Sequence, residues 1–291
     1  MNWRPRRPLH FALLAVAALL CAPPAGVWWL TRPQQREAGV PPSGEGLVAK
    51  RVEIAWPGGA PLIGWDVAIV DPRAALLVLH GRGSSRGAMG VRGELLARLR
   101  CASLLLDLPG HGESMADVVT LGAREADAVA PALAWLRARW PGVPLGALGI
   151  SMGGAALCLA PRTEPLRFVV LESTYATLPM AIEARIARFL GPLAPALAPL
   201  ANGTYRFLTG VDPAAVRPLD AIGALGSPLL LLHGRDDAST PFAQAELLFE
   251  GAKRPKELAA FPGAGHEDLL KQSPDFYAKL LRAFLDAHLP R

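Results

Sequence analysis

Residues 145–160, LGALGISMGGAALCLA, decide the fold of this chain. The first six residues are apolar enough for a strand covered on both faces, and residues 155–160 suit a helix. Between them, Gly149-Ile-Ser-Met-Gly153 places Ser151 on a sharp strand-to-helix turn. Such a turn exposes the hydroxyl, and the helix behind it directs N–H dipoles toward developing negative charge. The stretch predicts an α/β fold with Ser151 as a nucleophile.

Apolar runs and amphipathic stretches alternate along the rest of the chain. Residues 48–56 and 62–70, separated by Pro57-Gly58-Gly59, are typical of an antiparallel hairpin. Residues 124–140 have the spacing of an amphipathic helix. Five runs are too apolar for exposed strands: 74–79, 103–108, 145–150, 168–171 and 229–232. Together they predict a doubly wound, mostly parallel sheet with helices on both faces.

Residues 174–226 interrupt this alternation. About 53 residues exceed an ordinary crossover between strands. We expect a small helical lid insertion that folds over the carboxyl edge of the sheet. Its richness in Leu, Ala and Pro indicates either contact with apolar acyl chains or packing against the body.

A serine nucleophile needs a base, and the six histidines differ in their suitability. His266 follows the glycine-rich residues 263–265 and precedes the last predicted helix, so its imidazole can reach the sheet edge near Ser151. We expect His266 to be the general base. His80 and His233 precede glycines at strand ends, where structural hydrogen bonding is typical, and His111 lies in a turn.

A carboxylate that orients the histidine is expected between Ser151 and His266 in the chain. Residues 229–237, LLLLHGRDD, end a predicted strand with two candidates. The spacing from His233 and the following Pro241 favour Asp237. Asp236 remains the alternative, since only one of the two can face His266.

Transition-state stabilisation needs two backbone donors near the nucleophile. Met152, directly after Ser151, supplies one of them. The loop 80–83, His-Gly-Arg-Gly, supplies the other, with Arg82 N–H preferred and Gly83 as the alternative.

The three cysteines form no metal-binding pattern, and no metal or other cofactor is expected. Cys101 and Cys158 fall in a predicted strand and helix, so we expect small buried hydrophobic residues. Sequence alone leaves a disulfide between them open. Cys21 lies in an apolar N-terminal run.

These residues resemble the α/β-hydrolase superfamily over positions 48–291. The motifs are residues 79–81, 107–114, 149–154, 233–237 and 265–266, in the order of that family. The resemblance implies a serine hydrolase that cleaves a carboxylic ester, or less often an amide or thioester, through an acyl-enzyme. It implies a small-molecule ester as the substrate partner. An acyltransferase with the same intermediate, or a non-catalytic protein that binds a ligand, stays open.

Within the superfamily the chain is similar to membrane-anchored or exported bacterial hydrolases of the BEM46-like and serine aminopeptidase-like groups. The residues that carry this finer resemblance are 120–125, TLGARE, and 171–175, LESTY.

The net charge of +5 belongs entirely to the N-terminus. Five arginines precede the first acidic residue, Glu37, and the remaining 25 basic residues balance the 25 acidic ones. A balanced domain has no electrostatic signature of a nucleic-acid partner.

Residues 9–30 carry no charge and, as a helix, would span about 33 Å, enough for a bilayer core. We expect residues 1–30 to form a cytoplasmic tip and a transmembrane signal anchor, 31–46 a linker, and 47–291 the hydrolase domain. Arginines at 4–7 predict that the domain is extracytoplasmic. Pro23-Pro24 interrupts the helix, so a secreted form after signal cleavage remains open, as does a lipid anchor at Cys21.

Overall fold

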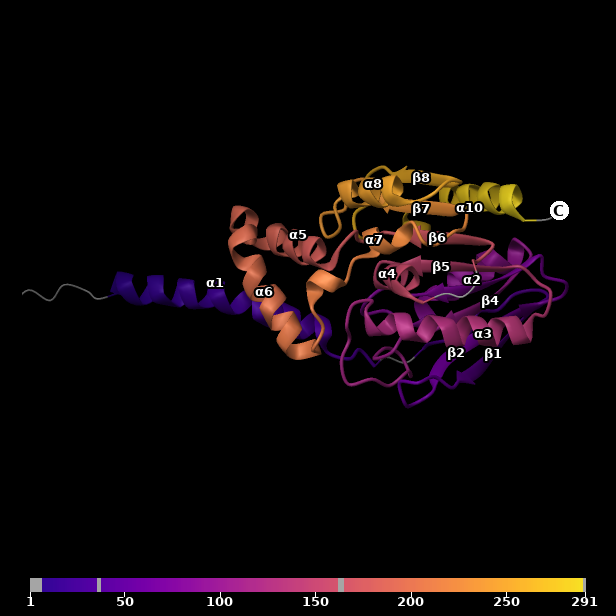
Figure 1. Ribbon diagram of the computed structural model, residues 1–291, viewed down its shortest axis with the longest axis horizontal. Coiled ribbons are helices and arrows are strands. Elements are labelled where there is room, and N and C mark those ends of the chain that lie inside the picture. The colour runs from indigo at the N-terminus through magenta and orange to yellow at the C-terminus, as the bar shows by residue number, and fades with distance from the viewer. Residues whose placement is uncertain (1–6, 36–37, 162–164, 290–291) are drawn as a thin grey trace, which may run out of the picture.

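One twisted sheet organises the molecule (Figure 1). The computed structural model describes residues 7–35, 38–161 and 165–289. Within these residues, eight strands pair in the order β1-β2-β4-β3-β5-β6-β7-β8. Their bounds are β1 Leu47–Ile54, β2 Leu62–Ile69, β3 Ala74–Leu79, β4 Cys101–Leu106, β5 Leu145–Ile150, β6 Phe168–Glu172, β7 Leu229–Gly234 and β8 Lys256–Phe261.

The pairing follows the prediction of a hairpin beside a mostly parallel sheet. Strands β1 and β2 are antiparallel, β2 joins β4 antiparallel, and all later neighbours are parallel. Strand β4 lies two residues earlier than the predicted 103–108. The reason is Asp107, whose side chain leaves the strand to accept hydrogen bonds from Arg86 and from the Glu113 N–H.

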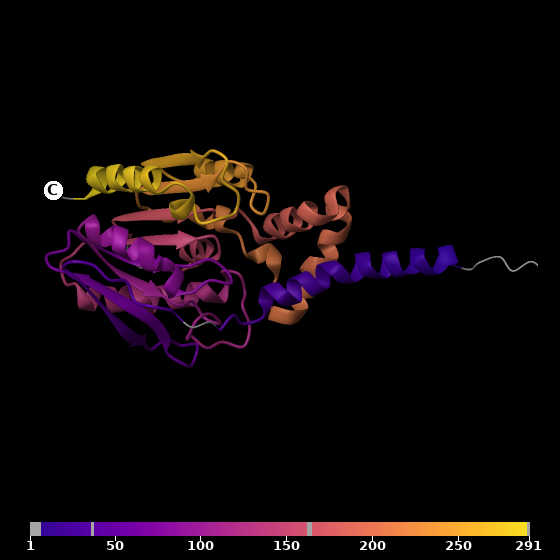
Figure 2. The same cartoon turned by 180° about the vertical axis from the view of Figure 1, so that it is seen from behind.

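Helices cover both faces of the sheet (Figures 1 and 2). On one face, α2 (Gly90–Arg98) and α10 (Pro274–His288) share a buried cluster. On the other, α3 (Val129–Arg139), α4 (Met152–Leu159) and α8 (Phe242–Gly251) share a second cluster. Because strands β3 to β7 are apolar along their length, burial on both faces is the arrangement that removes them from water.

The predicted helix 124–140 has two parts, a 3₁₀ turn at Arg124–Ala128 and α3. Its start is set by Glu125, whose buried carboxylate accepts hydrogen bonds from the Thr120 N–H and hydroxyl and from the Gly122 N–H. Burial raises the pKa of Glu125 despite these bonds. The Glu125 carboxylate therefore holds residues 120–122 of the loop against the start of the helix.

The long segment after β6 contains helices that project beyond one end of the sheet (Figure 1). These are α5 (Leu178–Leu190) and α6 (Ala194–Thr209), which pack together. Helix α7 (Pro218–Ile222) instead packs on α4 and α8. The Tyr205 hydroxyl of α6 donates to the Thr120 carbonyl at 2.7 Å, which ties the projecting pair to the body.

The N-terminal helix α1 (Arg7–Thr31) corrects one prediction. Among the described residues, no helix is both long and apolar enough to cross a membrane, so the transmembrane helix expected over residues 9–30 is not supported. Its last turns are a packing element instead. Val27 and Leu30 are buried in one cluster with Ala201 and Tyr205 of α6. Of the arginines at positions 4–7, those at 4 and 6 lie outside the described residues.

The segment expected as a linker, 31–46, contacts the body through its backbone. Gln34 N–H donates to the Gly110 carbonyl at 2.6 Å, and the Thr31 carbonyl accepts from Val119 N–H at 2.7 Å. These bonds hold the end of α1 against the loop that follows β4.

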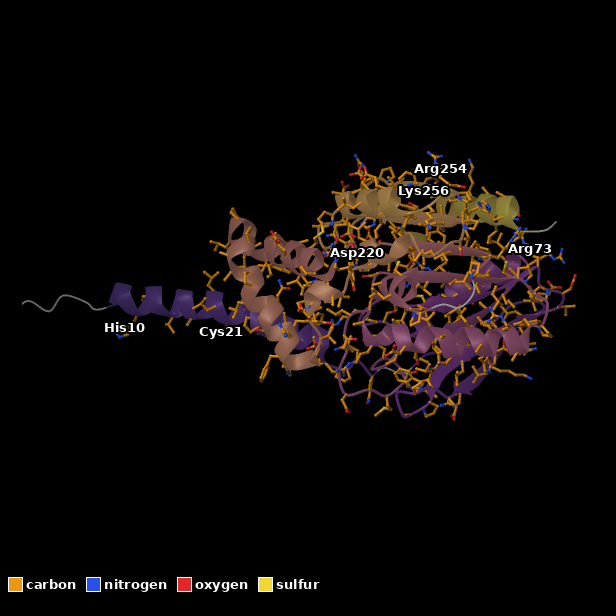
Figure 3. The ribbon with its side chains drawn as sticks, viewed as in Figure 1. His10, Cys21, Arg73, Asp220, Arg254 and Lys256 are labelled. Carbon is orange, nitrogen blue, oxygen red and sulfur yellow. The ribbon has the colours of Figure 1, made fainter. Side chains whose placement is uncertain are left out.

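Cys21, Cys101 and Cys158 form no disulfide, and Cys101 and Cys158 are buried as expected. Cys21 is exposed on the part of α1 that lies away from the sheet (Figure 3). Burial raises the pKa of the Cys101 thiol to about 11.

A buried ion network joins β6, α2 and the segment before α10. The Arg92 guanidinium donates to both carboxylate oxygens of Glu172, at 2.8 and 2.9 Å, and to Asp268 at 2.8 Å. A second Arg92 nitrogen donates to Asp268 at 3.2 Å, and the Tyr277 hydroxyl donates to Glu172 at 3.0 Å. Burial opposes ionisation of Asp268, but the hydrogen bond from Arg92 prevails and lowers its pKa.

Two buried histidines meet at the ends of β3 and β4. The Leu108 N–H donates to His80 Nε2 at 3.0 Å, and the His80 and His111 rings lie 5.0 Å apart. Burial lowers the pKa of His80 to about 4 and that of His111 to about 3. Both rings are therefore neutral parts of the fold near pH 7.

These two shifts predict acid instability. An unfolded histidine gains its proton near pH 6.5, whereas the folded ones resist until about pH 4 and 3. As the pH drops below 6.5, the free energy of unfolding therefore decreases by about 1.4 kcal/mol per pH unit for each histidine. Unfolding at pH 7 and pH 4.5 measures the loss. His111→Gln should make the loss smaller; an unchanged pH dependence in this variant would contradict the account.

The ion network predicts a large cost for removing its cation. Arg92→Met leaves the buried Glu172 without its partner, so we expect a loss of about 3–5 kcal/mol in unfolding free energy. Arg98→Met, at an exposed position in the same helix, should change it by less than about 0.5 kcal/mol. Chemical denaturation measures both. Adding Glu172→Gln to Arg92→Met should recover part of the loss, and equal losses for Arg92→Met and Arg98→Met would refute the role of the network.

Candidate active site

Ser151 lies on the sharp turn that its sequence predicts. Its backbone has φ 49° and ψ −110°, a strained conformation for a side chain other than glycine. Two glycines make the turn possible. A Cβ at Gly149 would lie 2.7 Å from the Gly153 backbone, and one at Gly153 would lie 2.7 Å from the His80 carbonyl. Glycine at 149 therefore lets β5 approach α4, and glycine at 153 lets α4 approach the end of β3.

His266 reaches Ser151 from the loop between β8 and α9 (Leu269–Gln272). Its Nε2 lies 3.2 Å from Ser151 Oγ, and its Nδ1 lies 2.7 Å from Asp237 Oδ2. The His266 side chain is 22% exposed, so a reacting molecule can approach its Nε2 side. The neighbouring Asp268 anchors this loop to Arg92.

Asp237 occupies the position expected of the orienting carboxylate. Asp237 follows β7 in the chain, and its side chain is buried. Its Oδ1 accepts hydrogen bonds from the N–H groups of Ser239 and Thr240, at 2.8 and 2.7 Å. Burial opposes ionisation, but the bonds from His266 and Thr240 prevail and lower its pKa. Asp236 is exposed, and its N–H donates to the Ala264 carbonyl. The geometry selects Asp237 over Asp236.

The second histidine near this carboxylate has a structural contact. His233 Nε2 lies 2.7 Å from the Thr240 carbonyl oxygen, and burial lowers the pKa of the ring. His233 therefore pairs within its own loop, as expected from its strand-end position.

Arg82 and Met152 line the same small cavity as Ser151, of about 50 Å³. Gly83, the alternative donor, has φ 75° and is not among the lining residues. The Arg82 side chain contacts helix α1. It donates to the Trp29 and Leu30 carbonyls of α1, and its guanidinium lies 3.7 Å from the centre of the Trp29 ring.

Ser151 also opens onto a larger and more polar cavity of about 410 Å³. Ser173, His266 and Glu267 line it, together with Trp29 of α1. A still larger hollow, of about 940 Å³, lies between the β1–β2 turn and α3 without touching Ser151. We take the cavity beside Ser151 as the functional one because it contains the reactive groups.

Sequence reasoning missed two contributions to the site. One is α1, which was expected to be an anchor. The other is Arg185 of α5, which lines both cavities at Ser151. Within the described residues it forms no hydrogen bond or ion pair, and burial lowers its pKa, with Arg188 adding to the effect. Helix α5 also contains Glu183 and Arg188, so nothing in the sequence singles out Arg185.

The donor set does not suit a metal ion. Within the residues that the structure describes, no group of three or more His, Cys, Asp or Glu side chains is placed to hold one. Any chemistry described below uses the chain's own groups.

Known proteins with similar sequences cover most of the chain. An uncharacterized Bacillus subtilis protein, YqkD, is 25% identical over 242 residues, which is 78% of this chain and 76% of YqkD. Human protein ABHD12B is 28% identical over 256 residues, which is 80% of this chain and 64% of that protein.

Solved structures share the fold. The Pyrococcus furiosus esterase Pf2001 has a TM-score of 0.73 at 22% identity, covering 89% of this chain and 98% of the esterase. The Rhodococcus esterase RhEst1 has a TM-score of 0.59 at 19% identity, covering 82% of this chain and 99% of RhEst1. At these identities the likeness concerns the fold.

The family comparison covers more than half of the chain. Residues 76–280 match the Alpha/beta hydrolase family, a range that includes Ser151, Asp237 and His266. The chain therefore belongs to the alpha/beta hydrolase family.

Proposed function

We propose that this protein is a serine hydrolase that cleaves a carboxylic ester through an acyl-enzyme. The observation that carries the proposal is the continuous hydrogen-bonded series Ser151, His266 and Asp237 at the carboxyl edge of the sheet. The esterases among the structural relatives support the same class of reaction. All three polar groups are present, which argues against a protein that only binds a ligand.

In the first half of the reaction, Ser151 Oγ attacks the ester carbonyl carbon while its proton passes to His266 Nε2. Asp237 accepts a hydrogen bond from His266 Nδ1, which fixes the neutral tautomer and then stabilises the imidazolium. The carbonyl oxygen becomes an oxyanion, which Met152 N–H and Arg82 N–H would stabilise. His266 returns the proton to the leaving alcohol, and the acyl group stays on Ser151.

In the second half, water takes the place of the alcohol. His266 removes a proton from water, the resulting nucleophile attacks the acyl-enzyme, and the acid leaves as Ser151 regains its proton. A competing alcohol in place of water would give transfer instead of hydrolysis. Turnover of a simple ester with and without added alcohol separates these two outcomes.

We also propose an extracytoplasmic location and a closer relationship to exported bacterial hydrolases. Support comes from the sequence alone: arginines precede the uncharged stretch 9–30, a pattern typical of a cytoplasmic N-terminus. In this proposal residues 9–30 serve as the export signal.

The location predicts that protease degrades the catalytic domain in cells whose outer layer has been permeabilised while the inner membrane stays intact. Degradation only after lysis would contradict an extracytoplasmic domain. Mass spectrometry of the recovered protein provides a second reading, because a chain that begins between residues 22 and 27 would reveal signal cleavage.

The triad predicts an ordered set of losses. Ser151→Ala should abolish labelling by a fluorophosphonate and nearly all ester hydrolysis, because no acyl-enzyme can form. His266→Ala should be about as damaging, and Asp237→Asn should lower kcat on the order of 10⁴-fold. Asp236→Asn is the matched control and should leave kcat within about twofold, because its exposed side chain is not bonded to His266.

Two results would overturn the assignment. One is wild-type hydrolysis by Ser151→Ala. The other is a larger loss from Asp236→Asn than from Asp237→Asn. Combining Ser151→Ala with His266→Ala should add little to either loss, because the two groups act as one unit.

A further inference from the structure

Helix α1 and helix α5 enclose a groove that continues from the nucleophile cavity. We define the α1–α5 groove by Ala22, Gly26 and Leu30 of α1 and by Ile182, Ile186 and Phe189 of α5. Its volume is about 440 Å³, within the range of small-molecule sites. Figures 1 and 2 both show α1 running beside α6 as it leaves the body.

The groove connects with the catalytic centre through shared residues. Leu30, Ile182 and Arg185 line both the groove and the small cavity that contains Ser151 and Met152. The groove and the Ser151 cavity therefore adjoin at these three side chains, and a molecule attached to Ser151 would enter the groove between Leu30 and Ile182.

The lining is apolar except at its inner end. Arg185 is the one charged residue among the described lining residues, and it lies beside the Ser151 cavity. Farther out the walls are aliphatic or aromatic, and Phe189 is 75% exposed. An occupant without polar groups would remove this surface from water, whereas a charged or strongly hydrated one would lose hydration without replacement.

The two walls give the groove a length. Ala22 and Leu30 are eight residues apart on α1, and Ile182 and Leu190 are eight apart on α5, so each wall is about 12 Å long. A fully extended polypeptide advances at most about 3.6 Å for every three backbone bonds. A linear alkyl chain has similar bond lengths, so it needs about ten bonds to span 12 Å.

We propose that the α1–α5 groove binds the acyl chain of the substrate and that the chain is linear and about eight to twelve carbons long. The inference rests on the proposed ester hydrolysis and names its substrate class. The acyl carbonyl then lies at Ser151, and the leaving alcohol lies in the more polar cavity lined by Ser173 and Glu267. Residues of α1 thereby become part of the substrate site.

Gly26 offers a direct test. A side chain at this position meets nothing within 4 Å of its Cβ, so a larger residue projects into the groove without disturbing the helix. Gly203 of α6 is a matched control: it is also helical, its Cβ would also meet nothing within 4 Å, and it does not line the groove.

The experiment compares kcat/KM for p-nitrophenyl acetate, butanoate, octanoate, decanoate and hexadecanoate in the intact chain and three variants. In the intact chain we expect kcat/KM to rise by at least tenfold from acetate to octanoate and to level off near decanoate. Burial of one methylene group can raise kcat/KM by at most about fourfold. Gly26→Leu should lower the ratio of decanoate to acetate about tenfold, Gly26→Ala should lower it less, and Gly203→Leu should leave it unchanged.

The outcomes separate this inference from the proposed function. Turnover of all esters with no dependence on chain length would overturn the acyl groove and leave the serine hydrolase intact. Absence of any turnover and of fluorophosphonate labelling would overturn the hydrolase first. Equal effects of Gly26→Leu and Gly203→Leu on the ratio would overturn the groove. A second result would also overturn it: Gly26→Leu changes the oligomeric state, measured by sedimentation, but leaves the decanoate-to-acetate ratio unaltered. The groove would then be an interface between copies of the chain.

Discussion

The site depends on the close approach of strand β5 to helix α4. Gly149 and Gly153 leave no room for a Cβ, and Ser151 between them is held at a positive φ. This strain is tolerated because the strand is hydrogen-bonded on both sides and the helix is buried. The result is a hydroxyl whose position is set by backbone packing, so its distance to His266 does not rely on a flexible side chain.

The other two members of the proposed triad are positioned by polar contacts inside the protein. Asp237 is held by two backbone N–H groups of its own loop. The His266 loop is fastened two residues later by Asp268, which meets the buried Arg92 and, through it, Glu172 at the end of β6. The Arg92 guanidinium therefore connects β6, the neighbour of the strand that leads to Ser151, with the loop that carries His266. Such a buried pair is costly to break, which keeps the loop in one conformation.

The sequence predicted a mostly parallel sheet and the chain positions of its buried strands, because wholly buried strands are recognisable as uninterrupted apolar runs. It also predicted that Ser151 and His266 come together, because short glycine-rich motifs constrain the backbone locally. The choice between Asp236 and Asp237 needed coordinates, since both follow the same strand and differ only in direction. Arg185 and the Arg82 contact to α1 could not be found, because they depend on how α1 and α5 lie against the body. The prediction of a membrane span rested on the uncharged stretch 9–30, and composition alone does not reveal that Val27 and Leu30 near the end of α1 pack against α6.

Helix α1 closes one side of the site, and this has a practical consequence. Its carbonyls receive the Arg82 side chain, and its apolar side forms a wall beside Ser151. A recombinant version that starts at the hydrolase domain would keep every catalytic residue yet expose Arg82 and the α5 surface to water. Such a shortened enzyme would be a poor guide to the selectivity of the whole protein, and inhibitors screened against it would be ranked on an open-sided site.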